Sequence, residues 1–129
     1  MKMTGQFQIS QWDENNTFES EDGHKMSLAA IKQSYSGDIS GTSAVNYSMC
    51  YMSPMLAYFS GYERLQLTVG EKTGVIVLSH DGQFAEGKAQ SDFTVLANAG
   101  EGDFAGVSGK GSFAAGAGGV ADYQLELEF

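Results

Sequence analysis

Residues 58–82, YFSGYERLQLTVGEKTGVIVLSHDG, contain two segments with the alternation of β-strands, joined by a Gly-Glu-Lys-Thr-Gly turn. In the first segment Leu65, Leu67 and Val69 alternate with polar neighbours, so one face is predicted to point inward and the other outward. The stretch therefore predicts an antiparallel hairpin, and the rest of the chain is interpreted around it.

The inward face of this hairpin carries one residue that does not suit an apolar core. Extending the alternation toward the N-terminus places Glu63 inward and Arg64 outward. Burying an unpaired carboxylate is costly, so Glu63 needs a partner. His80, at the end of the second segment, is a titratable candidate, and we predict that Glu63 and His80 are catalytic acid–base groups. The structural alternative is that Arg64 or a backbone N–H pairs with Glu63 and that His80 caps the hairpin.

The length of 129 residues fits one domain, residues 1–129, with a sizeable core. Seven Lys and Arg against sixteen Asp and Glu give a formal charge of −9. Such an acidic surface repels nucleic-acid backbones and anionic membranes, so neither is expected as a partner. No signal peptide or membrane span is recognisable, and Cys50 is the only cysteine, so no internal disulfide can form. We expect a soluble cytoplasmic protein.

Strand-like alternation recurs along the chain at hairpin spacing, and together with the hairpin it gives about eight strands. Such a series predicts an all-β fold, an antiparallel meander closed into a barrel, with an open sandwich as the alternative. The last segment is the most clearly one-sided strand and is expected to pair with the first. The polar residues 13–23 are predicted to form an exposed hairpin or loop. The further strand segments are residues 5–12, 24–38, 41–52, 83–97, 104–115 and 120–129.

Residues 24–38 have an ambiguous pattern. Met26 and Leu28 alternate with polar neighbours and are expected to face inward. The alternation slips by one residue at Ala29-Ala30, after which Ile31 and Tyr35 are expected to face inward. A helix is the competing interpretation, but a turn sequence ends the segment and its neighbours resemble strands. In the first segment, Trp12 falls on the wrong phase and predicts a bulge or a strand end.

Residues 83–97 have an inward face that begins with very small side chains: Ala85, Gly87, Ala89 and Ser91. Small residues lining a barrel either admit another side chain or leave space for a ligand.

A series of short motifs runs in order through nearly the whole chain: Gly5, Phe7, Trp12, Ser36-Gly37-Asp38-Ile39-x-Gly41, Tyr58-x-x-Gly61-Tyr62-Glu63-Arg64, His80-Asp81-Gly82, Ala99-Gly100-Glu101-Gly102-Asp103-Phe104-x-Gly106 and Tyr123-x-Leu125-x-Leu127-x-Phe129. In these residues the chain resembles a family of small bacterial proteins known only as domain of unknown function 3224. The resemblance implies a closed barrel similar to that of allene oxide cyclase, and it implies no reaction, because fold analogy is a weak warrant for function. Ala99, where a serine is expected, and Phe93, where a tryptophan is expected, depart from the family pattern.

Three functional classes remain open at this point. The first is a barrel that binds a small, largely apolar molecule in its lumen, with Tyr47, Tyr51, Tyr58 and Phe93 as the predicted ligand-binding residues. The second is a cofactor-free isomerase or cyclase in the same lumen, in which the acid–base pair moves a proton. The third is an interaction module with a filled core and no site.

No metal site is expected, since His24 and His80 lie far apart and no paired-ligand spacing is present. No cofactor is expected either, because the glycine-rich residues 100–106 lead into a strand and not into the helix start that a phosphate loop needs. The many tyrosines and methionines, which are enriched at interfaces, favour a homo-oligomer.

Overall fold

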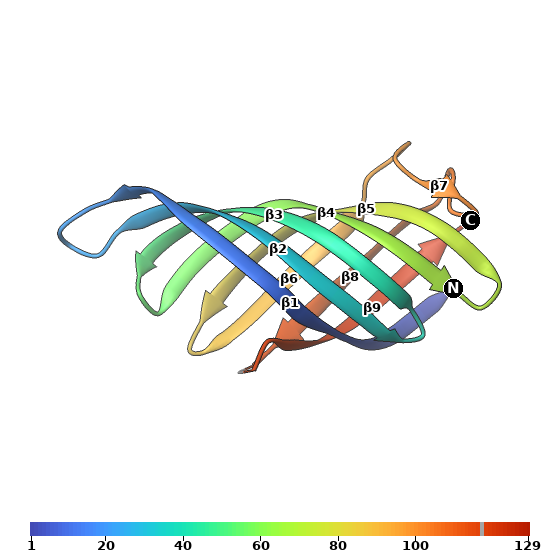
Figure 1. Ribbon diagram of the computed structural model, residues 1–129, viewed down its shortest axis with the longest axis horizontal. Coiled ribbons are helices and arrows are strands. Elements are labelled where there is room, and N and C mark those ends of the chain that lie inside the picture. Colours follow the sequence, from blue (N-terminus) through green and yellow to red (C-terminus); the bar gives the residue numbers. More distant parts are fainter. Residues whose placement is uncertain (117) are drawn as a thin grey trace.

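The computed structural model describes residues 1–116 and 118–129, and these residues form nine β-strands and no helix. Figure 1 shows the long strands winding diagonally around a common axis. Within the described residues, no helix is long and apolar enough to cross a membrane. The strands are β1 (Lys2–Glu19), β2 (Lys25–Gly37), β3 (Ser40–Ser53), β4 (Leu56–Val69), β5 (Lys72–Ala85), β6 (Lys88–Val95), β7 (Glu101–Gly102), β8 (Ser108–Ala115) and β9 (Val120–Glu128).

Eight of these strands are hydrogen-bonded into a closed ring. The order β4-β3-β2-β1-β9-β8-β6-β5 closes because β5 also pairs with β4, and every pairing is antiparallel. The two-residue β7 adds a short pairing to β5. The predicted closed meander is therefore confirmed, as is the pairing of the last strand with the first. The similarity to allene oxide cyclase stays a prediction.

The interior of the ring is filled mainly by the inward side chains of alternating residues. Glycines beside large rings make this filling possible. A Cβ atom on Gly82 would lie 2.6 Å from the Phe59 ring, and one on Gly111 would lie 2.6 Å from the Phe93 ring. Because an eight-stranded barrel is just wide enough for side chains to fill, such pairings of a small and a large residue determine where space remains.

Strand β2 is a strand throughout, but the predicted phase slip is wrong. Met26 and Leu28 point outward, with exposed fractions of 50% and 56%, whereas Ser27 and Gln33 point inward and are buried. The register between β2 and β3 is continuous across this segment. The polar side chains are accommodated inside because each has a partner on a neighbouring strand.

Strand β1 is longer than predicted and continues to Glu19, so most of the expected polar loop is strand, and only a short turn follows it. A register shift between Ile9 and Gln11 confirms the bulge expected near Trp12. Pairing between β1 and β9 stops at Gln8, and beyond this point the pairing of β1 is with β2. The second half of β1 therefore extends past the ring as part of a β1–β2 hairpin (Figure 1).

The barrel has two different ends. The end that carries both chain termini and β7 (Figure 1), here called the closed end, is covered by the loop of residues 96–107. Phe104 of this loop is fully buried, and its ring lies 5.8 Å from that of Phe129. The opposite end, here called the open end, is formed by the turns after β3, β5 and β8, beside the β1–β2 hairpin.

Candidate functional site

Glu63 and His80 meet inside the barrel. Alternation along β4 and β5 points both side chains inward, and each side chain is 1% exposed. The His80 Nε2 atom lies 2.7 Å from Glu63 Oε1. His80 was only a candidate partner in the sequence, and the structure brings the two groups together. Their catalytic role stays a prediction. Arg64 points outward and pairs with Glu101 at 3.1 Å, so the alternative in which Arg64 neutralises Glu63 is wrong.

Two further residues extend this pair into a chain of four, here called the buried network. The Tyr35 hydroxyl donates to Glu63 Oε2 at 2.5 Å, and Ser91 Oγ lies 2.9 Å from His80 Nδ1. Burial, and then the charge of Glu63 and the hydrogen bond to it, raises the pKa of Tyr35 well above its ordinary value. Our sequence interpretation placed Tyr35 and Ser91 on inward faces but gave neither a role, because their partners lie on other strands.

The order of a serine, a histidine and a carboxylate in the buried network is that of a nucleophilic triad. As whole residues Ser91 and His80 are only 2% and 3% exposed, however, and no member of the network lines the cavity described next. In this structure the network is enclosed by the core.

A cavity of about 290 Å³, here called the lumen cavity, occupies the open end of the barrel. Its walls are mostly aromatic and aliphatic, and small side chains on β6, β8 and β9 leave the space unfilled. Ala89 is among them, which agrees with the small inward face predicted for this segment. The lining residues are Phe7, Ile9, Trp12, Ile31, Gln33, Tyr47, Met49, Tyr51, Pro54, Phe59, Phe84, Ala89, Phe113, Ala115, Gly119 and Ala121.

Tyr47 connects the lumen cavity with the buried network. It lines the cavity, and its ring packs edge-on against the His80 ring at 5.5 Å between centroids. Its hydroxyl is buried and has no hydrogen-bond partner among the described residues. Burial, and then the charge of Glu63, raises the pKa of this phenol, which therefore keeps its proton. Phe113 likewise lines the cavity and contacts His80, at 5.7 Å between ring centroids.

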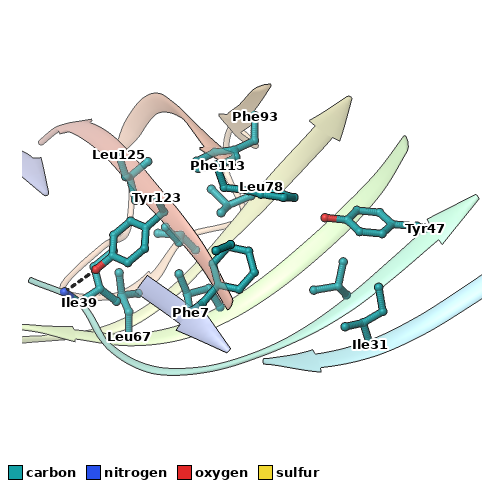
Figure 2. Close-up of a cluster of buried hydrophobic side chains, with 14 of the residues drawn as sticks. Phe7, Ile31, Ile39, Tyr47, Leu67, Leu78, Phe93, Phe113, Tyr123 and Leu125 are labelled. Carbon is teal, nitrogen blue, oxygen red and sulfur yellow. Dashed lines mark hydrogen bonds between the residues drawn. The ribbon is translucent and has the colours of Figure 1, made fainter. Parts of the chain in front are cut away.

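Figure 2 shows Tyr47 reaching across the interior, with its hydroxyl directed to the side where Phe7 and Phe113 lie. Both phenylalanines line the lumen cavity. The hydroxyl oxygen itself is enclosed by the core, so the ring of Tyr47 and not its polar atom contributes to the cavity wall.

Glu14 organises a polar cluster where the lumen cavity meets the β1–β2 hairpin. Its carboxylate accepts hydrogen bonds from Ser27 at 2.5 Å, Tyr51 at 2.9 Å and Trp12 at 3.0 Å. Burial raises the pKa of Glu14, but these hydrogen bonds and the charge of Lys25 outweigh it, so the pKa lies below its ordinary value of 4.5. Sequence reasoning missed this site, because Glu14 falls in the segment predicted to be a loop.

Tyr51 joins this Glu14 cluster to the cavity, which it lines. The Lys25 ammonium lies 4.2 Å from the centre of its ring. Burial, and then the hydrogen bond to Glu14, raises the pKa of Tyr51 to about 12. The remaining predicted ligand-binding residues lie elsewhere. Phe93 is buried 4.9 Å from the His80 ring and does not line the cavity.

The prediction that Tyr58 lies in the lumen is wrong. Its side chain is 49% exposed on the outer face of β4, because its neighbours Ala57 and Phe59 take the inward positions. Among the described residues, no group of three or more His, Cys, Asp or Glu side chains is placed to hold a metal ion.

The fold and the site together define a small all-β barrel with an apolar cavity at one end and a buried polar network beside it. The chain belongs to the family described as protein of unknown function (DUF3224), whose model matches residues 3–127. It is similar in structure to a protein of unknown function of this family from Shewanella oneidensis MR-1. The TM-score is 0.81 with 18% identity, over 100% of this chain and 97% of the other. No curated protein matches the sequence.

Proposed function

We propose that the barrel binds a small, largely apolar molecule in the lumen cavity. The observation that carries this proposal is the cavity itself: about 290 Å³ of space at the open end, walled by rings and aliphatic side chains, with few polar groups. Ligand sites in proteins have this character, a mostly apolar concavity with a small number of placed hydrogen-bonding groups. Here the lining residues that carry polar side-chain groups, apart from Tyr47 with its enclosed hydroxyl, are Trp12, Gln33 and Tyr51.

The cavity disfavours an interaction module with a filled core, since an unfilled apolar space of this size forfeits packing contacts that larger side chains would supply. Volume at the open end is preserved by Ala89, Ala115 and Ala121, where larger apolar residues would close it. The cytoplasmic location and the homo-oligomer expected from the sequence stay predictions.

Binding is tested with the neutral fluorescent probe N-phenyl-1-naphthylamine and a matched pair of variants. Ala115 lines the cavity, whereas its neighbour Ala114 is exposed on the same strand. We expect Ala115→Leu to fill the cavity and weaken probe binding more than tenfold, and Ala114→Leu to bind as the wild type does. Absence of probe binding by the wild type, or unchanged binding by Ala115→Leu, would contradict the proposal.

The natural occupant is sought by native mass spectrometry of the protein purified from its own host, followed by denaturation to release bound molecules. A co-purifying apolar compound that is lost from Ala115→Leu would support the proposal and name the chemical class. If the purified protein holds no compound and also fails to bind the probe, the result would favour an interaction module.

A second candidate function is a cofactor-free isomerase or cyclase, and the contact between Glu63 and His80 directly behind Tyr47 favours it. The two functions differ in what Glu63→Gln does. Because Glu63 does not line the cavity, a binding protein keeps its affinity for the probe in this variant. An enzyme that uses Glu63 as its base loses turnover of the co-purified compound or of a close analogue.

A further inference from the structure

We infer that the occupant of the lumen cavity carries one neutral hydroxyl group, which hydrogen-bonds to the side-chain amide of Gln33, on an otherwise apolar body. This inference rests on the proposed function and specifies the chemistry of its ligand. It starts from the cavity-lining residues that carry a polar side-chain group, which are Trp12, Gln33, Tyr47 and Tyr51.

The donors of three of these residues are not available to a ligand. The Trp12 N–H and the Tyr51 hydroxyl both donate to Glu14, at 3.0 and 2.9 Å. The Tyr47 hydroxyl is enclosed by the core, so a molecule in the cavity does not reach it. Gln33 is therefore the lining residue that still has a polar group to offer.

Gln33 points into the barrel from β2 and is 3% exposed. Its Oε1 accepts from Ser43 Oγ at 3.3 Å, and its Nε2 has no hydrogen-bond partner among the described residues. In that part of the chain the Tyr47 hydroxyl is the one enclosed side-chain polar atom without a partner, so the unpartnered Nε2 of Gln33 keeps accessible surface. Because this side chain points inward and lines the cavity, the amide is accessible from the cavity.

The contact with Ser43 leaves part of the Gln33 amide free in either orientation of the amide. A serine hydroxyl can donate to the amide oxygen or accept from the amide N–H, so turning the amide over keeps this contact and exchanges the group that is left for the cavity. A ligand hydroxyl is complementary to both arrangements, because it accepts from an N–H and donates to an oxygen. A methionine of similar length would fill the same space without burying an incompletely bonded amide, so the amide has its use when a polar group enters the cavity.

A charged ligand group does not suit the wall around Gln33. None of the lining residues in the described part of the chain is charged, and the neighbours of Gln33 in the wall include Ile9, opposite it on β1, and Ile31 on its own strand. A carboxylate or an ammonium group placed here would lose its hydration without gaining a counter-ion. A neutral hydroxyl that is hydrogen-bonded can be buried at little cost.

The test uses three probes of similar shape: 4-phenyl-1-butanol, pentylbenzene, which replaces the hydroxyl by a methyl group, and 4-phenylbutanoate, which replaces the CH₂OH group by a carboxylate. Their affinities are measured by displacement of N-phenyl-1-naphthylamine from the wild type, from Gln33→Met and from Gln8→Met. Gln8 lies on the neighbouring strand β1 but is exposed on its outer face, so this variant is the matched control. Circular dichroism and thermal melting establish that the variants are folded, and Gln33→Leu takes the place of Gln33→Met if the latter does not fold.

We expect the ratio of alcohol affinity to hydrocarbon affinity to fall about fivefold in Gln33→Met, as one lost hydrogen bond predicts, and to stay unchanged in Gln8→Met. The hydrocarbon serves as the reference for any change in the shape of the cavity. The carboxylate should bind at least tenfold more weakly than the alcohol.

Four results would overturn the inference while the proposed function stands: an unchanged ratio in the folded Gln33 variant, an equal fall in Gln8→Met, a carboxylate that binds as well as the alcohol, or an alcohol that fails to displace the bound probe. Failure of N-phenyl-1-naphthylamine itself to bind to the wild type would overturn both the inference and the proposed function.

Discussion

The closed end and the open end of the barrel are built from the same alternating strands, yet one is packed and the other is hollow. At the closed end, loop 96–107 inserts Phe104 as a plug, and this ring belongs to the same buried core cluster as Ile39 and Leu127. At the open end only short turns follow β3 and β5, and Ala89 and Ala115 occupy positions where larger side chains would meet.

This difference teaches that the strand ring does not by itself decide whether the lumen is filled. An eight-stranded barrel has an interior that side chains can just fill. Whether they do so depends on a few residues: a plug at one end, and alanines at the other. Between the two ends, the buried network supplies polar contacts deep in the core.

The largest expected effect is the loss of the plug. Phe104→Ala removes a fully buried ring and should lower the free energy of unfolding by about 4 kcal/mol. Phe18→Ala, at a position 45% exposed on β1, should change it by about 0.5 kcal/mol or less. Urea unfolding of both variants measures the difference. Equal costs for the two substitutions would show that the closed end is not packed as described.

The buried network should follow next in magnitude. Glu63→Leu leaves the Tyr35 hydroxyl and His80 Nε2 without their acceptor and should cost about 3 kcal/mol. A second change, His80→Leu, should then cost little more or restore stability, because it removes one of the orphaned groups. Full additivity of the two single changes in urea unfolding would mean that Glu63 and His80 do not interact.

The alternation of apolar and polar residues within single segments was sufficient to predict most of the fold. The clean alternation of β4 and β9 predicted the hairpin, the closure between the first and last strands, and the inward position of Glu63. Side-chain alternation depends only on near neighbours in the chain, so it can be read from one sequence. The sequence offered His80 as a possible partner of Glu63 but left their contact open, because that contact depends on the register between β4 and β5.

The wrong predictions of side-chain direction concern features that the hydrophobicity of one segment does not show, such as contacts between strands. In β2 the polar Ser27 is inside because Glu14 on β1 accepts its hydroxyl, whereas the apolar Met26 and Leu28 remain outside. Hydrophobicity alone therefore assigned the wrong face. The lumen placement of Tyr58 failed for a related reason: its type suited a ligand site, but its phase on β4 did not.

A smaller effect should separate a tyrosine with partners from one without. Tyr123→Phe removes a hydroxyl that makes two hydrogen bonds and leaves the Ile39 N–H unpaired, which should cost about 1–2 kcal/mol. Tyr47→Phe removes a hydroxyl with no partner and should leave stability unchanged or raise it by about 1 kcal/mol. Thermal and urea unfolding of the two variants make the comparison. A loss for Tyr47→Phe as large as that for Tyr123→Phe would show that the Tyr47 hydroxyl is satisfied within the folded protein.

The smallest effect is expected from Glu14 at the open end, and it should depend on pH. Because folding lowers the pKa of Glu14 below 4.5, its ionised form stabilises the protein above that pH, and the contribution is lost as the pH falls through the folded-state pKa. Glu14→Gln should therefore be less stable than the wild type at pH 7. The difference should be about 1 kcal/mol or less, because Glu14 is only partly buried and solvent screens its charge. Near pH 3 the two proteins should be equally stable. Urea midpoints at both pH values test this, with Glu21→Gln in the nearby exposed turn as the control for losing one negative charge. A difference from wild type that persists at pH 3 would mean that Glu14 stabilises the open end by its shape and not by its charge.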